Sequence, residues 1–184
     1  MRENIKIIGI LTIVCLGCAL FLALTENMAK EKIAYNENKA IKDAIFNIVK
    51  ECKDIEAINI KGKTVYKIFD KNNNLIGYGF LCEGEGYQGK IKIMTAVNNN
   101  FEKLLGIEII SSSETPGLGA KINEDFFKCQ FKGLNIKDPI EYTKGKVRKD
   151  NEIKAITGAT ISSRSVVNIL NKTIKELKSN IKVK

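Results

Sequence analysis

The stretch Ala155–Val167 reads AITGATISSRSVV and joins a cluster of small and hydroxyl residues to the start of a helical pattern. Apolar residues continue after it at three- and four-residue spacing, at Val166, Val167, Ile169, Leu170 and Ile174. A turn that leads into a helix N-terminus presents free backbone amides and the positive end of the helix dipole, which together favour a phosphate group. The stretch therefore predicts a phosphate-facing turn. An ordinary Ser or Thr N-cap is the alternative interpretation of the same residues.

A second motif, Glu114–Gly119, reads ETPGLG and follows three serines. Pro116 with Gly117 indicates a tight turn, and Gly119 indicates another. A turn-rich loop at the end of a predicted strand is a common place for binding residues. A third segment, Gly86–Gly89, reads GYQG, and its glycines permit close approach of a planar ligand. A simple connection between two strands also explains this segment.

Together, ITGATISS and ETPGLG resemble two signatures of the FMN-binding domain family, and GYQG resembles a third segment of that family. The family includes the G subunit of the Rnf electron-transport complex and the C subunit of the sodium-pumping NADH:quinone reductase. In it, the last threonine of the S/T-G-A-T motif carries FMN through a phosphodiester bond, and the matching residue here is Thr160. The resemblance implies a cofactor-binding set of Thr160, Thr157, Gly158, Ala159, Ser162, Ser163, Glu114, Thr115, Pro116, Gly117, Leu118, Gly119, Tyr87 and Gly89.

The sequence departs from the family pattern at one position. The family usually has an aspartate three residues before the S/T of the motif, where this chain has Lys154. The resemblance implies that a dedicated flavin transferase reads this motif, so Lys154 bears on the efficiency of attachment rather than on the fold. A threonine hydroxyl is a poor nucleophile without a base or metal. Because the chain has no histidine, we expect the transferase and its metal to activate Thr160.

Composition excludes several other functions. The 184 residues carry 30 Lys and Arg against 21 Asp and Glu, a net charge of +9. Arginine occurs only three times and forms no basic stripe with interleaved aromatics, so we expect no nucleic-acid partner. The absence of histidine removes Ser-His and Cys-His catalysis. The five cysteines lack metal-site spacing in the soluble part, so we expect no metal site. With no histidine to act as a base, we also expect no catalytic residues.

The N-terminus contains an uncharged apolar run, Ile7–Leu24, that is close to the length needed to cross a bilayer. A cleaved signal peptide is one alternative, but the run is long for that purpose and no clear cleavage site follows. A lipoprotein anchor at Cys18 is another, but Cys15 stands where such anchors have an aliphatic residue. We therefore expect a retained transmembrane anchor. The simplest topology places the N-terminus in the cytoplasm and the following domain outside.

The rest of the chain predicts an α+β fold. Glu26–Val49 reads as a polar helix with a sparse apolar stripe, either a connector or an amphipathic core helix. From Thr64 onward the period is two, and asparagine-rich turns at 71–74 and 98–100 predict an antiparallel meander of about four strands. We also expect a short helix capped by Asn123 and a final helix from about Ser162 to Lys178.

The predicted organisation is a cytoplasmic N-terminus and transmembrane anchor at 1–25, a helical connector at 26–50 and an FMN-binding domain at 51–184. The resemblance implies a membrane-anchored, electron-carrying subunit of an ion-translocating ferredoxin:NAD oxidoreductase (Rnf) complex, with covalent FMN on the extracytoplasmic side. Its partners would be the other Rnf membrane subunits and the flavin transferase. Two alternatives stay open: a stand-alone extracytoplasmic flavin carrier, and a non-redox membrane-anchored binding domain in which TGATISS is only a helix cap.

Overall fold

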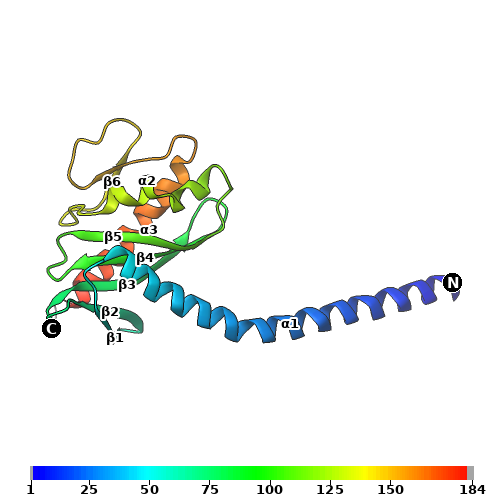
Figure 1. The fold of residues 1–184 in the computed structure, drawn as a ribbon. Helices are drawn as coiled ribbons and strands as arrows, with labels where there is room; N and C mark the ends of the chain where they lie inside the picture. The colour runs from blue at the N-terminus through cyan, green and yellow to red at the C-terminus, as the bar shows by residue number, and fades with distance from the viewer. Residues whose placement is uncertain (1, 182–184) are drawn as a thin grey trace. The chain divides into compact units, whose positions relative to one another are not determined.

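The computed structural model describes residues 2–181, so residue 1 and residues 182–184, which the predicted domains include, lie outside the described residues (Figure 1). Its contacts divide the chain into two units, Met1–Ala40 and Ile41–Lys184. The second unit contains all three sequence motifs.

A long first helix, α1 (Arg2–Ile48), contains the apolar N-terminal run. Its segment Lys6–Glu26 has 21 residues with a mean hydropathy of 2.8, and its side chains are exposed. At 1.5 Å per residue this segment is about 30 Å long, which matches the hydrocarbon thickness of a bilayer. The segment includes the predicted span Ile7–Leu24. Length and composition alone are equally those of a signal sequence, so retention of the helix stays a prediction.

The second unit is built on a five-stranded antiparallel sheet in the order β1-β2-β3-β4-β5. The strands are β1 (Asp54–Ile60), β2 (Lys63–Phe69), β3 (Leu75–Glu85), β4 (Lys90–Asn98) and β5 (Leu104–Ser112). The predicted meander corresponds to β2–β5 and is confirmed. The edge strand β1 was missed, because its apolar residues are only partly buried and its pattern is correspondingly weak.

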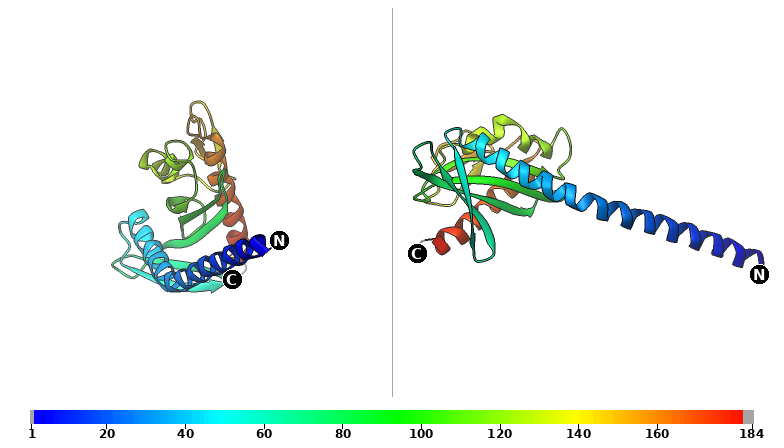
Figure 2. Two further views of the ribbon diagram at one scale, coloured as in Figure 1. Left: turned by 90° about the vertical axis from the view of Figure 1, so that its right-hand side faces the viewer. Right: turned by 60° about the horizontal axis from the view of Figure 1, so that its bottom comes forward.

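The two faces of the sheet bury different residues, as the two-residue period of a strand requires. On β4, Ile93 and Val97 point into the larger core, whereas Met94 and Ala96 point to the opposite face. The last turns of α1, through Ile45, cover the Met94 face. The C-terminal helix α3 (Thr160–Ile181) covers the other face (Figure 2). Its buried residues are Val166, Val167, Ile169, Leu170, Ile174 and Leu177.

A series of short elements connects β5 to α3 (Figure 1). They are η1 (Gly119–Asn123), α2 (Asp125–Lys128), η2 (Cys129–Phe131) and the parallel pair β6 (Glu141–Thr143) and β7 (Glu152–Lys154). One expectation is corrected here. Asn123 ends η1 instead of capping a helix, and Glu124 precedes α2 without a side-chain cap. Helix α3 begins at Thr160, two residues before the predicted Ser162.

Candidate functional site

The three sequence motifs meet around one open cavity of about 440 Å³. The GYQG loop follows β3, the ETPGLG loop follows β5, and the TGAT segment begins α3, so the topology of the sheet brings them together. The lining residues come from all three: Tyr87, Glu114, Thr115, Leu118, Gly119, Gly158, Ala159, Thr160, Ile161 and Ser162.

The TGAT segment forms a tight turn immediately before α3. The Ala159 amide donates to the Ile156 carbonyl at 3.0 Å, and Gly158 has a φ of +82°. A positive φ at the third residue of such a turn is typical of type II turns and favours glycine. The turn places Ala159 directly before the helix and makes Thr160 its first residue.

The beginning of α3 has no side-chain cap of the Ser or Thr type, because the preceding residue is Ala159. The first helical hydrogen bond of α3 runs from the Ser163 amide to the Ala159 carbonyl, at 3.0 Å. The amides of Thr160, Ile161 and Ser162 therefore precede the intrahelical ladder, as the first amides of any helix do. These amides and the helix dipole make the cavity wall suitable for an anion. The ordinary N-cap interpretation of the motif does not describe this geometry.

Ser163 supports the turn from inside the protein. Its fully buried hydroxyl donates to the Ala159 carbonyl and accepts the Ile156 amide, both at 3.0 Å. Ser163 is not among the residues that line the cavity, and neither is the exposed Thr157. The predicted binding set thus includes two residues that shape or flank the turn rather than face the cavity.

Glu114 joins the three motifs through its carboxylate and is only 6% exposed. Its Oε1 accepts the Tyr87 amide at 2.6 Å and the Gln88 amide at 3.1 Å. Its Oε2 accepts the Ser162 hydroxyl at 2.5 Å. The GYQG loop is also closed on itself, because the Gly86 amide donates to the Gly89 carbonyl at 2.7 Å. Glu114 and Ser162 are 48 positions apart in the sequence, and Tyr87 lies still further from Ser162.

The glycines of the ETPGLG loop have two different structural roles. Gly117 has a φ of +75°, in the left-handed region, whereas a Cβ on Gly119 would lie 2.6 Å from the Ser162 Oγ. Both positions therefore favour glycine, Gly117 through its positive φ and Gly119 through its close contacts. Pro116 and Gly117 are exposed and lie outside the cavity lining, as does Gly89. They shape the loops around the site.

Sequence reasoning missed two participants in the site. Ile161 lines the cavity and is 45% exposed, and the Gln88 amide is one of the donors to Glu114. Tyr87 and Leu118, which also line the cavity, are 63% and 51% exposed. Three exposed apolar side chains around one cavity are an unusual local feature for a soluble surface. Ile161 was discoverable, since it lies inside the ITGATISS motif.

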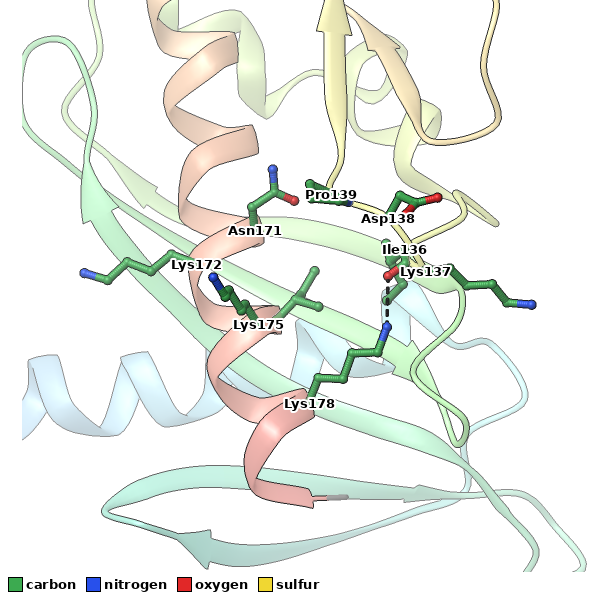
Figure 3. Close-up of a pocket in the computed structure, with 9 residues that line it drawn as sticks. Ile136, Lys137, Asp138, Pro139, Asn171, Lys172, Lys175 and Lys178 are labelled. Carbon is green, nitrogen blue, oxygen red and sulfur yellow. Dashed lines mark hydrogen bonds between the residues drawn. The ribbon is translucent and has the colours of Figure 1, made fainter. Parts of the chain in front are cut away.

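A second cavity of about 290 Å³ lies between the later turns of α3 and residues 136–139 (Figure 3). Asn171 and Ile140 exchange two hydrogen bonds there, at 2.8 and 2.9 Å, which hold this segment on the helix. Among the lysines around it, Lys178 donates to the Ile136 carbonyl at 3.5 Å, whereas Lys137 and Lys172 extend in opposite directions. None of the motif residues lines this cavity, so we assign it a structural role.

Cysteine and metal chemistry find no support at the site. Burial raises the pKa of the Cys82 thiol to about 11, so this group stays protonated and unreactive at neutral pH. Cys129 is exposed and Cys52 is partly buried, and none of the five cysteines forms a disulfide. Among the residues that the structure describes, no group of three or more His, Cys, Asp or Glu side chains could hold a metal ion.

Comparison with known proteins gives the class of this domain. The FMN-binding domain family matches residues 86–175, a range that contains all three motifs. The crystal structure of Shewanella oneidensis NqrC shares the fold, with a TM-score of 0.59 at 24% identity, covering 61% of this chain and 55% of that one. The domain around the cavity is therefore an FMN-binding domain.

Longer matches define the family of the whole chain. The chain is 30% identical over 167 residues to the G subunit of the proton-translocating ferredoxin:NAD(+) oxidoreductase complex of Clostridium ljungdahlii, covering 91% of this chain and 88% of that protein. It is 29% identical over 181 residues to the G subunit of the ion-translocating oxidoreductase complex of Methanosarcina acetivorans, covering 94% of each. The chain thus belongs to the family of G subunits of ion-translocating oxidoreductase (Rnf) complexes.

Proposed function

We propose that this chain is the membrane-anchored flavoprotein subunit of an Rnf complex and carries electrons through FMN joined covalently to Thr160. The observation that carries the proposal is the meeting of three motifs around Thr160 at the uncapped N-terminus of α3. Membership of the FMN-binding domain family supports FMN as the cofactor. The covalent bond and the attachment residue are the parts that this proposal adds.

The phosphate end of the cofactor fits the start of α3. The Thr160 hydroxyl belongs to the first helical residue, beside the amides of Ile161 and Ser162. A phosphodiester keeps a negative charge, which the helix dipole and these amides stabilise. The turn at Gly158 leaves room for this approach, since the nearest heavy atom to a Cβ there would be Leu118 Cδ2 at 3.6 Å.

The ring end of the cofactor fits the apolar rim. Tyr87, Leu118 and Ile161 present exposed apolar surface at the cavity, and a planar ring would cover part of it. The volume of about 440 Å³ lies within the usual range of small-molecule sites, about 300–1,000 Å³. A cavity that is open on one side leaves an edge of the ring accessible for electron transfer.

The residues that line the cavity indicate which chemical steps belong to FMN, to this protein and to the transferase. When bound, FMN supplies the redox chemistry, and the protein supplies position and shielding. The cavity lining contains no histidine, lysine or cysteine that could activate the Thr160 hydroxyl. A flavin transferase acting in trans supplies that activation. The chain is accordingly an electron-carrying subunit rather than a complete enzyme.

Membrane attachment and partners follow from the same family. Relatives such as that of Clostridium ljungdahlii are named as subunits of a translocating complex, so the other Rnf membrane subunits are the proposed partners. The segment Lys6–Glu26, which is long and apolar enough to cross a bilayer, is the proposed membrane span. We place the FMN domain on the extracytoplasmic side, where a covalent bond would prevent loss of the cofactor.

The proposal is tested by producing the full chain with and without a flavin transferase and measuring its intact mass and in-gel flavin fluorescence. We expect a mass increase of one FMN moiety, with fluorescence that survives denaturation, only when the transferase is present. An unmodified protein under both conditions would contradict covalent attachment. Co-purification with other Rnf subunits from native membranes separates the proposed function from a stand-alone flavin carrier.

A further inference from the structure

Glu114 is part of the cavity lining, yet its carboxylate is already engaged by the protein. We propose that Glu114 is a positioning residue that assembles the cofactor site before the cofactor arrives. It does so by holding the GYQG loop and the first turn of α3 together. This inference rests on the proposed function, and it replaces direct cofactor binding as the role of the Glu114 side chain.

The hydrogen bonds of Glu114 leave little capacity for a ligand. An ionised carboxylate only accepts hydrogen bonds, and both of its oxygens already accept short ones, from Tyr87 and Ser162. A phosphodiester also has only acceptor oxygens and carries the same sign of charge. The carboxylate and the phosphate therefore repel each other, and the phosphate is better placed at the free amides of α3.

The backbone is shaped to admit this carboxylate. Gly86 lies against Oε1, and a Cβ there would also lie 2.8 Å from the Gly89 carbonyl oxygen. Gly119 lies against Oε2 on the other side, next to the Ser162 hydroxyl. Because two glycines from two different motifs make room for the same side chain, the arrangement is specific to a carboxylate-sized group at position 114.

The contacts connect Glu114 to the proposed cofactor atoms through other residues. The amide bond at Tyr87 fixes the backbone that carries an exposed ring at the cavity rim. The bond to Ser162 fixes the first turn of α3, which begins with Thr160.

Three variants separate positioning from other roles. In Glu114→Gln, the amide oxygen can still accept the two backbone amides, and the NH₂ group can donate to Ser162, whose hydroxyl then accepts. Glu114→Ala loses all of these contacts. Ser162→Ala removes only the bond to α3. Glu85→Ala, an exposed acidic residue one position before Gly86, is the matched control for loss of charge.

The first measurement is amide hydrogen exchange on the full chain in detergent, produced without a transferase. We expect the Tyr87 and Gln88 amides to exchange roughly tenfold faster or more in Glu114→Ala, because each loses a charged acceptor. Exchange at these amides should stay near the wild-type rate in Glu114→Gln, Ser162→Ala and Glu85→Ala. Wild-type protection in Glu114→Ala would overturn the proposal without any reference to the cofactor.

The second measurement is the initial rate of FMN transfer to Thr160 by purified transferase, followed by the fluorescence anisotropy of the attached flavin. We expect Glu114→Gln and Glu85→Ala to match the wild type. Ser162→Ala should be slower, and Glu114→Ala slowest and with the most mobile flavin. Ser162→Ala keeps the Glu114–Tyr87 bond, so it tests the α3 contact even if Glu114→Ala folds poorly.

The possible failures are distinguishable. A wild-type chain that accepts no FMN at Thr160 would overturn the proposed function, and with it a positioning role toward that cofactor. If the wild type accepts FMN but Glu114→Ala and Ser162→Ala do so at the same rate, the inference fails while the proposed function stands. A loss in Glu114→Gln as large as in Glu114→Ala would also overturn it, because the charge would then matter more than the hydrogen bonds.

Discussion

At the scale of single residues, Thr160 is the position on which the proposed chemistry depends. We expect Thr160→Ala to abolish covalent FMN, because alanine has no oxygen that could form the phosphodiester. Thr157→Ser should keep it, since Thr157 is exposed, lies outside the cavity lining and retains a hydroxyl in this variant. Peptide mapping by mass spectrometry locates the adduct. An adduct on Thr157 or Ser162 in the unmodified sequence would contradict the assignment.

Gly119 tests how closely the ETPGLG loop approaches α3. In Gly119→Ala the new Cβ would lie 2.6 Å from the Ser162 Oγ and also against the Glu114 carboxylate. We expect a clear fall in the fluorescence anisotropy of the attached flavin, with only a small fall in the melting temperature. Gly117→Ala is the comparison, because it strains a positive φ at 75° without meeting any heavy atom within 4 Å. Fluorescence anisotropy and thermal melts on the same samples decide between the two effects.

Lys154 is suited to a test of recognition by the flavin transferase. Its side chain is exposed, and hydrogen bonds to its backbone fix its position. The Lys154 amide donates to Gln130 Oε1 at 2.7 Å, and its carbonyl accepts Gln130 Nε2 at 3.2 Å. Lys154→Asp introduces the residue that the family resemblance leads us to expect at this position, and it leaves these backbone bonds available. We expect equal or faster FMN transfer in a time course with purified transferase. Slower transfer would mean that the transferase for this protein prefers the lysine.

At the scale of elements, the junction between the TGAT turn and α3 depends on Ser163. Removing its hydroxyl leaves the Ile156 amide without its acceptor inside the protein. An unsatisfied buried donor costs about 1–3 kcal/mol, so Ser163→Ala should lower the melting temperature by several degrees. We expect the variant to fold, because Val166, Val167 and Leu170 still anchor α3 in the core.

The control for this prediction lies on the same helix. Ser179 is exposed, and its hydroxyl donates to the Glu176 carbonyl within α3. Ser179→Ala should change the free energy of unfolding by less than about 0.5 kcal/mol, as surface substitutions usually do. Equal melting temperatures for Ser163→Ala and Ser179→Ala would show that Ser163 does not stabilise the turn.

At the scale of the whole molecule, the main prediction concerns the N-terminal part of α1. We expect Lys6–Glu26 to be retained in the mature protein as a membrane span, since the uncharged run Ile7–Leu24 lacks a clear cleavage site. Edman sequencing of protein purified from membranes should give a sequence that starts before Ile7. A mature N-terminus after Leu24 would identify the segment as a signal peptide.

Local sequence patterns sufficed for much of this protein. The four strands β2–β5 follow from two-residue alternation and asparagine turns, because side chains of a strand alternate between two faces regardless of the partner strand. The apolar run Ile7–Leu24 reads as a span because bilayer thickness sets its length. Most of the residues that line the cavity were expected from the resemblance of ETPGLG, ITGATISS and GYQG to family motifs, whereas local patterns alone indicated only turns and a helix start.

What sequence patterns could not supply was the role of each motif residue. Ser162 and Ser163 are adjacent hydroxyls, yet one donates to Glu114 across 48 positions and the other supports the turn from the core. Glu114 resembled a ligand contact in the sequence, but in the structure its carboxylate accepts hydrogen bonds from the GYQG loop and from Ser162 in the first turn of α3. The edge strand β1 was also invisible, since its residues are only partly buried and depend on β2 for their pairing. Such roles depend on which segments pack together, and packing is a property of the folded chain rather than of any window of sequence.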